Sequence, residues 1–364
     1  MTEGSITKSI ALAIAVVLAG AGSAAIAQPI AIDTTPEPDE RRNIYTFQVD
    51  NDFFNIIGKS DRDYTNGLRF GWLSPALPDL PEGVTSLVTI PTFFGERPVT
   101  SATRRFGVSF GQNLYTPEDL TTAQPIRNDR PYAAWLYLGF ALQSTYKRAD
   151  PKTGKDEPVR LDTLQLDLGV VGPAAVGEPT QNNFHTLIGN PRSFGWANQL
   201  HNEPTVGLTF ERRWRADRGV LLENPKFEYD FVPRLGATVG NVVTYASVGG
   251  TVRIGKDLRS DFGPARARPA LPGSEGFIGE SWAWYFFAGL NGEAVARNIF
   301  LDGNTDGNSL VHVTHRPFVG EASAGLTLQL RGARISFTQI LRTPEFFERD
   351  RFDFFGSVNV SFRY

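Results

Sequence analysis

Polar and apolar residues alternate along most of the chain beyond residue 42. In the last segment, 354–364, nearly every second residue is apolar or glycine, and the residues between them are polar. Alternation with a period of two predicts a β-strand with one apolar and one polar face. The pattern recurs and predicts about twelve strands. They lie near 43–50, 65–74, 104–112, 133–145, 161–171, 204–214, 226–239, 242–255, 281–297, 318–330, 332–342 and 352–364.

A soluble β-sandwich also alternates in this way, but three features favour a membrane barrel. Many segments have the length of a tilted spanning strand, about 9–12 residues. Aromatic residues such as Trp72, Trp135 and Trp214 stand near segment ends, as in interfacial girdles. An even number of strands lets an antiparallel sheet close without edges. The predicted fold class is all-β, an antiparallel transmembrane β-barrel of about 12 strands with a short helix in an extracellular loop.

The N-terminus has the plan of a secretory signal peptide. Lys8 precedes an apolar run at 9–20, and small residues lead to Ala25 and Ala27. The run is shorter than the roughly 20 residues of a membrane anchor, which is the alternative reading. We therefore expect a signal peptide at 1–27, an N-terminal segment at 28–42 and the barrel domain at 43–364.

Composition excludes several classes of protein. Among 364 residues there is no cysteine, which excludes a disulfide framework, a thiol nucleophile and cysteine metal sites. The slightly negative mean hydropathy excludes a polytopic helical membrane protein. With 36 basic and 39 acidic side chains, the net charge of −3 gives no reason to expect a nucleic-acid partner.

Strand parity places the most concentrated chemistry at one end of the barrel. If the N-terminus is periplasmic, the extracellular connections are 51–64, 113–132, 172–203, one near 240, 298–317 and 343–351. The first brings together oxygen-bearing side chains, namely Asp50, Asn51, Asp52, Asp61, Asp63, Thr65 and Asn66. Hard cations such as Ca²⁺ bind six to eight oxygens. The alternative is ordinary turn chemistry, since Asp, Asn and Gly favour turns.

A short helix is predicted in the third of these connections. Pro179 suits a first helical turn and Gly189 suits a helix end. Gln181 and His185, at i and i+4, share one face, and Phe184 with Ile188 forms an adjacent apolar face that we expect against the barrel rim. A neutral histidine can activate water near neutral pH. The alternative is a histidine with a surface or packing role.

Six segments together resemble one family. They are NDFF (51–54), DYTNGL (63–68), GQNLYTP (111–117), RPYAAWLYLG (130–139), GVVGPAAVGEPTQNNFHTLIG (169–189) and GWANQL (195–200). In order and spacing they resemble the outer-membrane lipid A 3′-O-deacylase family. The segment that contains the histidine is the most specific of them. The resemblance covers most of the mature chain.

The resemblance implies a twelve-stranded barrel and a Ca²⁺-dependent esterase that removes the 3′-linked acyl chains of lipid A. It implies a site on the outer rim, between the barrel wall and a loop helix. The family's site residues correspond to Asn51, Asp52, Thr65, Gln181 and His185. Some members have a second acid after the Asn-Asp pair, where this chain has Phe53. Asp50 or Asp63 might take its place, so the expected cation ligands are Asp52, Asn51 and Asp50.

The expected mechanism combines a cation that stabilises the oxyanion with His185 as general base on water. Basic loop residues, namely Lys59, Arg62, Arg127 and Arg130, could bind the lipid A phosphates, or they could simply balance charge. The expected partners are lipopolysaccharide and outer-membrane lipids, and the oligomeric state stays open. An outer-membrane phospholipase is the enzyme alternative, disfavoured because no serine beside a histidine is found. A pore or structural barrel is the non-enzymatic alternative.

Overall fold

The protein is described by a computed structural model. It covers residues 38–51, 54, 63–77, 99–149, 154, 156–216, 219–221, 227–264 and 282–364, with the backbone alone at 63–65. Several sequence predictions therefore fall outside the described residues. They are the signal peptide at 1–27, most of the N-terminal segment at 28–42, and Asp52, Lys59, Asp61 and Arg62.

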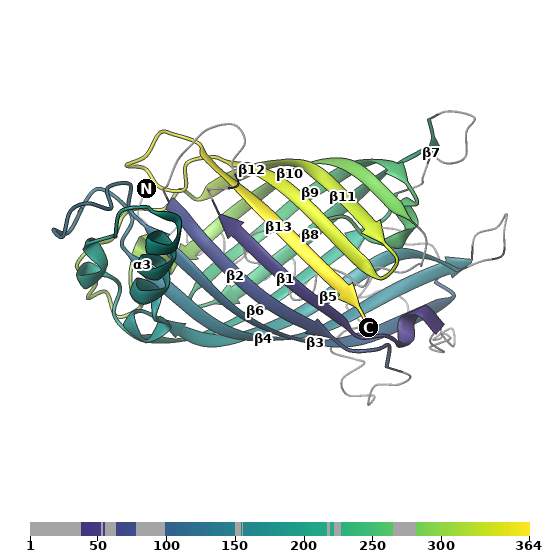
Figure 1. Cartoon of the computed structure of the whole chain (residues 1–364), viewed down its shortest axis with the longest axis horizontal. Coiled ribbons are helices and arrows are strands. Elements are labelled where there is room, and N and C mark those ends of the chain that lie inside the picture. Colours follow the sequence, from purple (N-terminus) through teal and green to yellow (C-terminus); the bar gives the residue numbers. More distant parts are fainter. Residues whose placement is uncertain are drawn as a thin grey trace, which may run out of the picture.

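The described residues form a closed antiparallel barrel of twelve long strands (Figure 1). Neighbouring strands in the chain are neighbours in the sheet, β1 pairs with β13, and β6 pairs with β8 to complete the ring. A two-residue strand, β7 (Gly219–Val220), extends β8 at one end. The twelve strands are β1 (Ile44–Asn51), β2 (Asp63–Leu73), β3 (Ser101–Thr116), β4 (Ala133–Ala149), β5 (Asp156–Val171), β6 (Glu203–Trp214), β8 (Glu228–Gly240), β9 (Val243–Lys256), β10 (Ala283–Asn298), β11 (Phe318–Leu330), β12 (Ala333–Arg342) and β13 (Asp353–Arg363). The predicted count and order of strands are confirmed.

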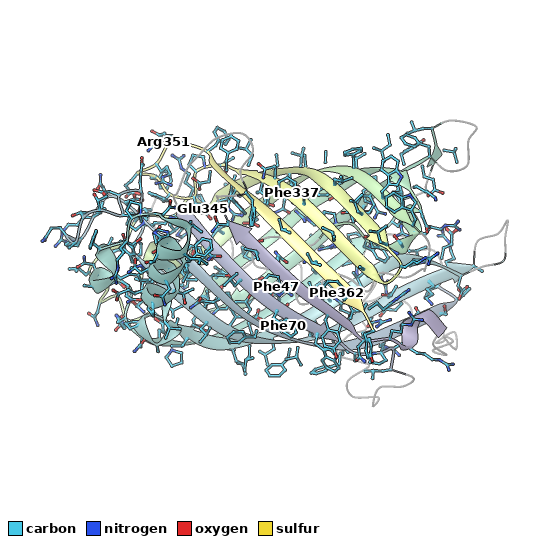
Figure 2. The ribbon with its side chains drawn as sticks, in the orientation of Figure 1. Phe47, Phe70, Phe337, Glu345, Arg351 and Phe362 are labelled. Atoms are coloured by element: carbon cyan, nitrogen blue, oxygen red, sulfur yellow. The ribbon has the colours of Figure 1, made fainter. Side chains whose placement is uncertain are left out.

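Alternation along each strand separates an outer apolar face from an inner polar one. On β1, Phe47 is about half exposed, whereas Thr46 and Gln48 beside it are buried. Figure 2 shows Phe47, Phe70, Phe337 and Phe362 along the outer wall. Since a sheet that spans a membrane must present apolar side chains to lipid on one face, this division is the physical reason for the period of two.

The lumen is filled by paired charges. Arg253 donates hydrogen bonds to Asp230 and Asp261, and Arg212 forms a bidentate pair with Asp162 at 2.8 Å for each bond. Buried charges are tolerated when they are paired and hydrogen-bonded. The interior is thus packed with side chains, as expected for a barrel of this size.

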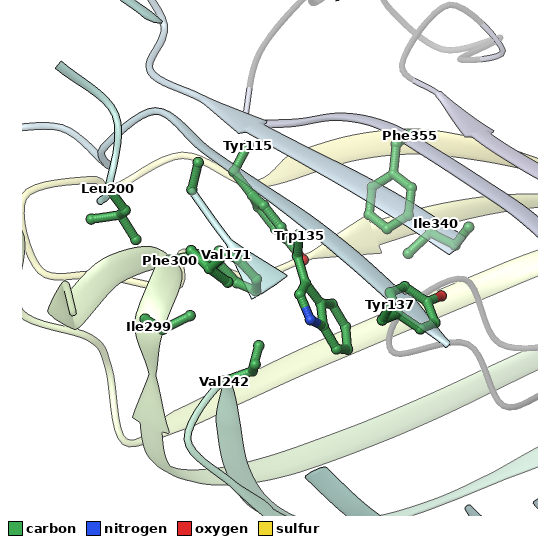
Figure 3. Close-up of a cluster of buried hydrophobic side chains, with 11 residues drawn as sticks. Tyr115, Trp135, Tyr137, Val171, Leu200, Val242, Ile299, Phe300, Ile340 and Phe355 are labelled. Carbon is green, nitrogen blue, oxygen red and sulfur yellow. The ribbon is translucent and has the colours of Figure 1, made fainter. Parts of the chain in front are cut away.

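Connections between strands gather side chains at the end of the barrel that carries α3 (Gly177–Ile188), here called the α3 end. Within the lumen at this end, Tyr115 stacks on Phe300 of α4 (Ile299–Asp302) with ring centroids 3.8 Å apart, and Trp135 stacks on Tyr137 at 4.2 Å. Figure 3 shows these rings together with Val242, Ile340 and Phe355. The apolar cluster fills the lumen directly behind the wall on which α3 packs.

Short helices complete the described structure. They are the 3₁₀ turns η1 (Pro38–Arg41), η3 (Pro173–Ala175), η4 (Gly195–Asn198) and η5 (Leu258–Ser260), besides α3 and α4. The helix predicted from Pro179 and Gly189 is confirmed: α3 ends at Gly189, whose φ of 76° is the left-handed geometry that glycine adopts readily. Across the described ranges, no helix is long and apolar enough to cross a membrane.

Candidate active site

Helix α3 and its flanking turns cover the outer face of the barrel wall at its rim. Leu114 on β3 and Ala134 on β4 have the same strand parity as Phe110 and Leu138, which are 50% and 46% exposed. Leu114 and Ala134 are instead fully buried, because Ala175 and Trp196 pack over them in one apolar cluster. The space between α3 and the wall is therefore on the lipid-facing side of the barrel and not in the lumen.

The polar face of α3 points into this space. Gln181, Asn182 and His185 are buried, whereas Ile188 is 40% exposed and Leu187 is 81% exposed. The expectation that the Phe184–Ile188 face would lie against the rim is wrong for Ile188, whereas Phe184 is partly buried. Apolar side chains have no need of protein cover where the surroundings are lipid, and the buried face is free to hold chemistry.

His185 is held in one tautomer by the loop that follows its helix. Its Nδ1 lies 2.6 Å from the carbonyl oxygen of Pro191, which only accepts hydrogen bonds. In the neutral ring Nδ1 therefore carries the proton, and Nε2 has the free lone pair that a general base requires. Among the described residues Nε2 has no recorded hydrogen-bond partner.

Gln181, one turn before His185, is fixed through its oxygen. Trp196 Nε1 donates a 2.7 Å hydrogen bond to Gln181 Oε1. Gln181 Nε2 is buried and donates to no acceptor within the described part of the chain. A buried amide donor without an acceptor is costly unless a ligand or water uses it. Gln181 thus offers an oriented N–H group on the same face as His185.

Carboxamides also replace apolar residues on the wall near α3. Asn51 of β1 pairs with Asn66 of β2 across the two strands. Both lie on the outer face, the same face as the exposed pair Phe47 and Phe70. Gln112 lies on the outer face of β3, the same face as the exposed Phe106 and Phe110. Its side chain donates a 2.6 Å hydrogen bond to the carbonyl oxygen of Ala175. Both asparagines and Gln112 are buried. Polar groups at lipid-facing positions are expensive and mark functional sites.

Thr65 lies at a β-bulge beside these amides. The pairing of β2 with β3 shifts between Tyr64 and Asn66, so Thr65 is the extra residue. Bulges re-aim side chains and are common next to active sites. The structure therefore brings Asn51, Thr65 and Asn66 to one corner of the wall. Sequence reasoning placed Asn66 in the first loop but did not select it, and it missed Gln112.

Asp50 does not share that face. Gln48 Nε2 donates a 3.0 Å hydrogen bond to Asp50 Oδ1, and both side chains belong to the inner series of β1. Because successive strand residues point to opposite faces, Asp50 points away from Asn51. Asn66 Oδ1, by contrast, is buried and accepts no hydrogen bond from any described residue. An amide oxygen left over beside Asn51 fits an oxygen-ligated cation better than Asp50 does.

Comparison with known proteins identifies the chain. The model of one protein family, described as outer membrane protein LpxR, matches residues 10–364. The chain belongs to the LpxR family. The resemblance read from the sequence is thereby confirmed, and the barrel is an outer-membrane barrel.

Solved structures agree with this fold. The structure of LpxR from Salmonella typhimurium superposes with a TM-score of 0.67 at 21% identity, covering 88% of this chain and 99% of that one. The β domain of the Bordetella autotransporter BrkA is less similar, with a TM-score of 0.38 at 12% identity, covering 89% of this chain and 98% of that one. The comparison with curated proteins returned no match.

The basic residues expected to bind phosphate do not share one environment in this LpxR-family barrel. Arg130 is buried in the lumen cluster, where its Nη2 donates a 2.7 Å hydrogen bond to Glu345 Oε2 and its guanidinium lies over the ring of Phe346. A phosphate outside the wall cannot reach it there. Arg127 is exposed in the β3–β4 connection. The structure thus gives Arg130 an ion-pairing role inside the barrel. Arg127 stays a predicted phosphate-binding residue.

Two groups outside the spanning strands have shifted acidities near the site. Burial raises the pKa of Tyr132 to about 12, so its phenol stays protonated at physiological pH. Burial also raises the pKa of Asp129, against hydrogen bonds from the backbone N–H groups of Glu118 and Arg130. Within the described ranges no group of three or more histidine or acidic side chains lies close enough to hold a metal ion.

Proposed function

We propose that this LpxR-family protein is a Ca²⁺-dependent lipid A 3′-O-deacylase, a carboxylic ester hydrolase that works at the extracellular rim of the outer membrane. Family membership supports a lipid A deacylase role. The observation that supports the site most strongly is that Gln181 and His185 are buried on α3, while Asn66 and Gln112 are buried at outward positions of the wall that carries this helix. An ester of a membrane lipid can enter the space between α3 and the wall without leaving the bilayer.

The residues suggest the roles in hydrolysis. His185 Nε2 takes a proton from water as the water attacks the ester carbonyl, and the carbonyl oxygen of Pro191 stabilises the imidazolium that forms. Gln181 Nε2 is an N–H donor for the attacking water or for the oxyanion. Positioned proton transfer contributes roughly 10²–10⁴-fold to the rate of such reactions.

Residues of the β1–β2 corner would hold the cation. Asp52 supplies charge, and Asn51 with Asn66 supplies amide oxygens on the same face. When bound, a calcium ion would polarise the ester carbonyl and stabilise negative charge on its oxygen. We assign to Thr65, the extra residue at the bulge next to Asn66, a role in orienting water or substrate.

Mass spectrometry of lipid A tests the function. Cells with the protein should lose the 3′-linked acyloxyacyl unit relative to cells without it, and chelation of Ca²⁺ should prevent the loss. Asp52→Ala should abolish the reaction, while Asp50→Asn, on the inner face, should retain it. Cleavage of phospholipids in place of lipid A would support a phospholipase, and ion conductance without lipid cleavage would support a pore. Either result would overturn the proposal.

A further inference from the structure

The outer wall on the side opposite α3 has a groove. It encloses about 950 Å³ and crosses β8 to β12. Helix α3 contacts β3 and β4, whereas the edges of the groove, β8 and β12, lie three strands from β4 and four strands from β3 around the ring. The groove is therefore separate from the site described above.

Small residues at outward positions form the floor of the groove. Leu290 at its centre pairs with Gly250 on β9 and Ala322 on β11, and Gly292 pairs with Gly320. Larger apolar side chains stand around them, among them Phe231, Val248, Val252, Leu341 and Phe352. On the ungrooved wall of β6, by contrast, outward positions hold Val206 and Leu208. The depression is therefore lined mainly by apolar side chains and glycines.

The groove leads to an arginine at the α3 end. A second hollow, of about 720 Å³, shares Val248, Gly292, Gly320 and Thr343 with the groove and extends to Arg316. Arg316 Nε donates to the carbonyl oxygen of Phe346 at 3.0 Å, and Nη2 donates to the carbonyl oxygen of Arg349 and to Asp350 Oδ1. These bonds fix the guanidinium, while Nη1 has no recorded acceptor within the described residues.

Two chemistries thus meet on one surface: an apolar channel in the lipid-facing wall and a fixed, half-buried cation where the channel reaches the rim. A lipid with acyl chains and a phosphate on its head group complements both. We propose that the groove binds one lipid A molecule of the surrounding leaflet, with an acyl chain along Gly292 and Gly320 and a phosphate at Arg316. This second site has a structural or regulatory role and takes no part in hydrolysis. Its proposal depends on the proposed function only for which end of the barrel faces outward from the cell.

Photo-crosslinking tests the proposal without reference to hydrolysis. A benzophenone amino acid replaces Leu290 in the groove or, as a control, Leu208 on the ungrooved wall of β6, in vesicles that contain lipid A and phosphatidylglycerol. At position 290 we expect lipid A adducts enriched over the vesicle composition, and at position 208 we expect adducts that follow the composition. Equal adduct ratios at the two positions, enrichment of phosphatidylglycerol, or protein–protein adducts would each overturn the proposal.

Four variants test the shape of the groove and the charge of Arg316 separately. Arg316→Ala should lower the enrichment about tenfold, as expected for the loss of one charge-assisted hydrogen bond, and Asp350→Asn should raise it, because Asp350 competes for Arg316. Gly292→Leu should abolish the enrichment by filling the groove, since a Cβ there meets nothing closer than Val248 O at 4.0 Å. Ala324→Leu, an outward position on β11 outside the groove, should leave the enrichment unchanged.

Discussion

The two opposite walls of this barrel are built by the same alternation but present different surfaces to the membrane. On the wall that carries α3, outward positions hold Gln112, which donates a hydrogen bond to Ala175 just before the helix, and Asn51 with Asn66 on β1 and β2; all three are buried. On the far wall, outward positions hold Gly292 and Gly320 and stay uncovered. Polar groups in contact with lipid need protein cover to be tolerated, whereas a shaped apolar surface needs none. Chemistry and lipid binding can thus occupy separate walls of one barrel.

A substitution that displaces α3 from the barrel wall should have the largest effect on the deacylation rate. Gly177 begins the helix, and a Cβ at this position would lie 2.4 Å from Ala134 Cβ and 2.7 Å from Trp196 Cη2. Gly177→Val should therefore displace His185 and lower deacylation by at least about 10²-fold, since small misplacements cost this much. The assay is lipid A mass spectrometry with heat-modifiable gel migration to verify the fold. Gly189→Asn, at the far end of the same helix, should retain activity, because asparagine tolerates the left-handed backbone.

A change in the lumen should affect stability and spare the reaction. Arg130→Met removes one partner of a buried ion pair, which costs about 3 kcal/mol, at the low end of the usual range because Arg342 still pairs with Glu345. Chemical unfolding of the purified barrel measures the loss. A loss of activity in fully folded Arg130→Met would instead restore Arg130 as a phosphate-binding residue.

Removing the bond that orients Gln181 should have a smaller effect on rate. Trp196→Phe keeps the ring in its apolar cluster but deletes the 2.7 Å hydrogen bond to Gln181 Oε1. A neutral hydrogen bond contributes about 1 kcal/mol, so kcat should fall about fivefold while KM changes little. An unchanged kcat would show that the Gln181 side chain does not act in the reaction.

The smallest expected effect is that of pH on the local stability of the β10–β11 connection. Asp302 accepts a 2.6 Å hydrogen bond from His315 Nδ1, and this bond raises the pKa of His315 above its ordinary value of 6.5. Protonated His315 is favoured in the fold, so its stabilisation is complete below pH 6.5 and is lost as the pH rises through the raised pKa. After correction for the intrinsic pH dependence of amide exchange, residues 299–317 should be less protected from hydrogen exchange at pH 8 than at pH 6. In Asp302→Asn this difference should disappear, and a difference that persists would point to another group.

The sequence predicted the barrel well because the membrane imposes a period of two on every strand. It also predicted that Gln181 and His185 share a helix face. It did not predict which face of α3 meets the wall, since Ile188 reads as a packing residue unless lipid lies on the other side. Gln112 was predictable in principle, because it continues the outward series of Phe106 and Phe110.

Other features depend on contacts that no local pattern encodes. Arg130 stands in a polar loop segment, and its partner Glu345 is 215 residues away in the chain. The groove likewise depends on the register of three strands, which brings Gly250, Leu290 and Ala322 into one row. Asp50 was misassigned for a simpler reason: its strand continues through Asn51, so the two side chains point to opposite faces.

The central claim is that hydrolysis takes place between α3 and the outer wall, with His185 as the base. The direct test compares the deacylation rate of two folded variants, His185→Gln on the wall and Glu293→Gln in the lumen, where Arg342 keeps Glu321 and Glu345 as partners. We expect a fall of roughly 10²–10⁴-fold for His185→Gln and a rate close to that of the unaltered protein for Glu293→Gln. Retained activity in His185→Gln, or a loss of activity only in Glu293→Gln, would exclude His185 as the base.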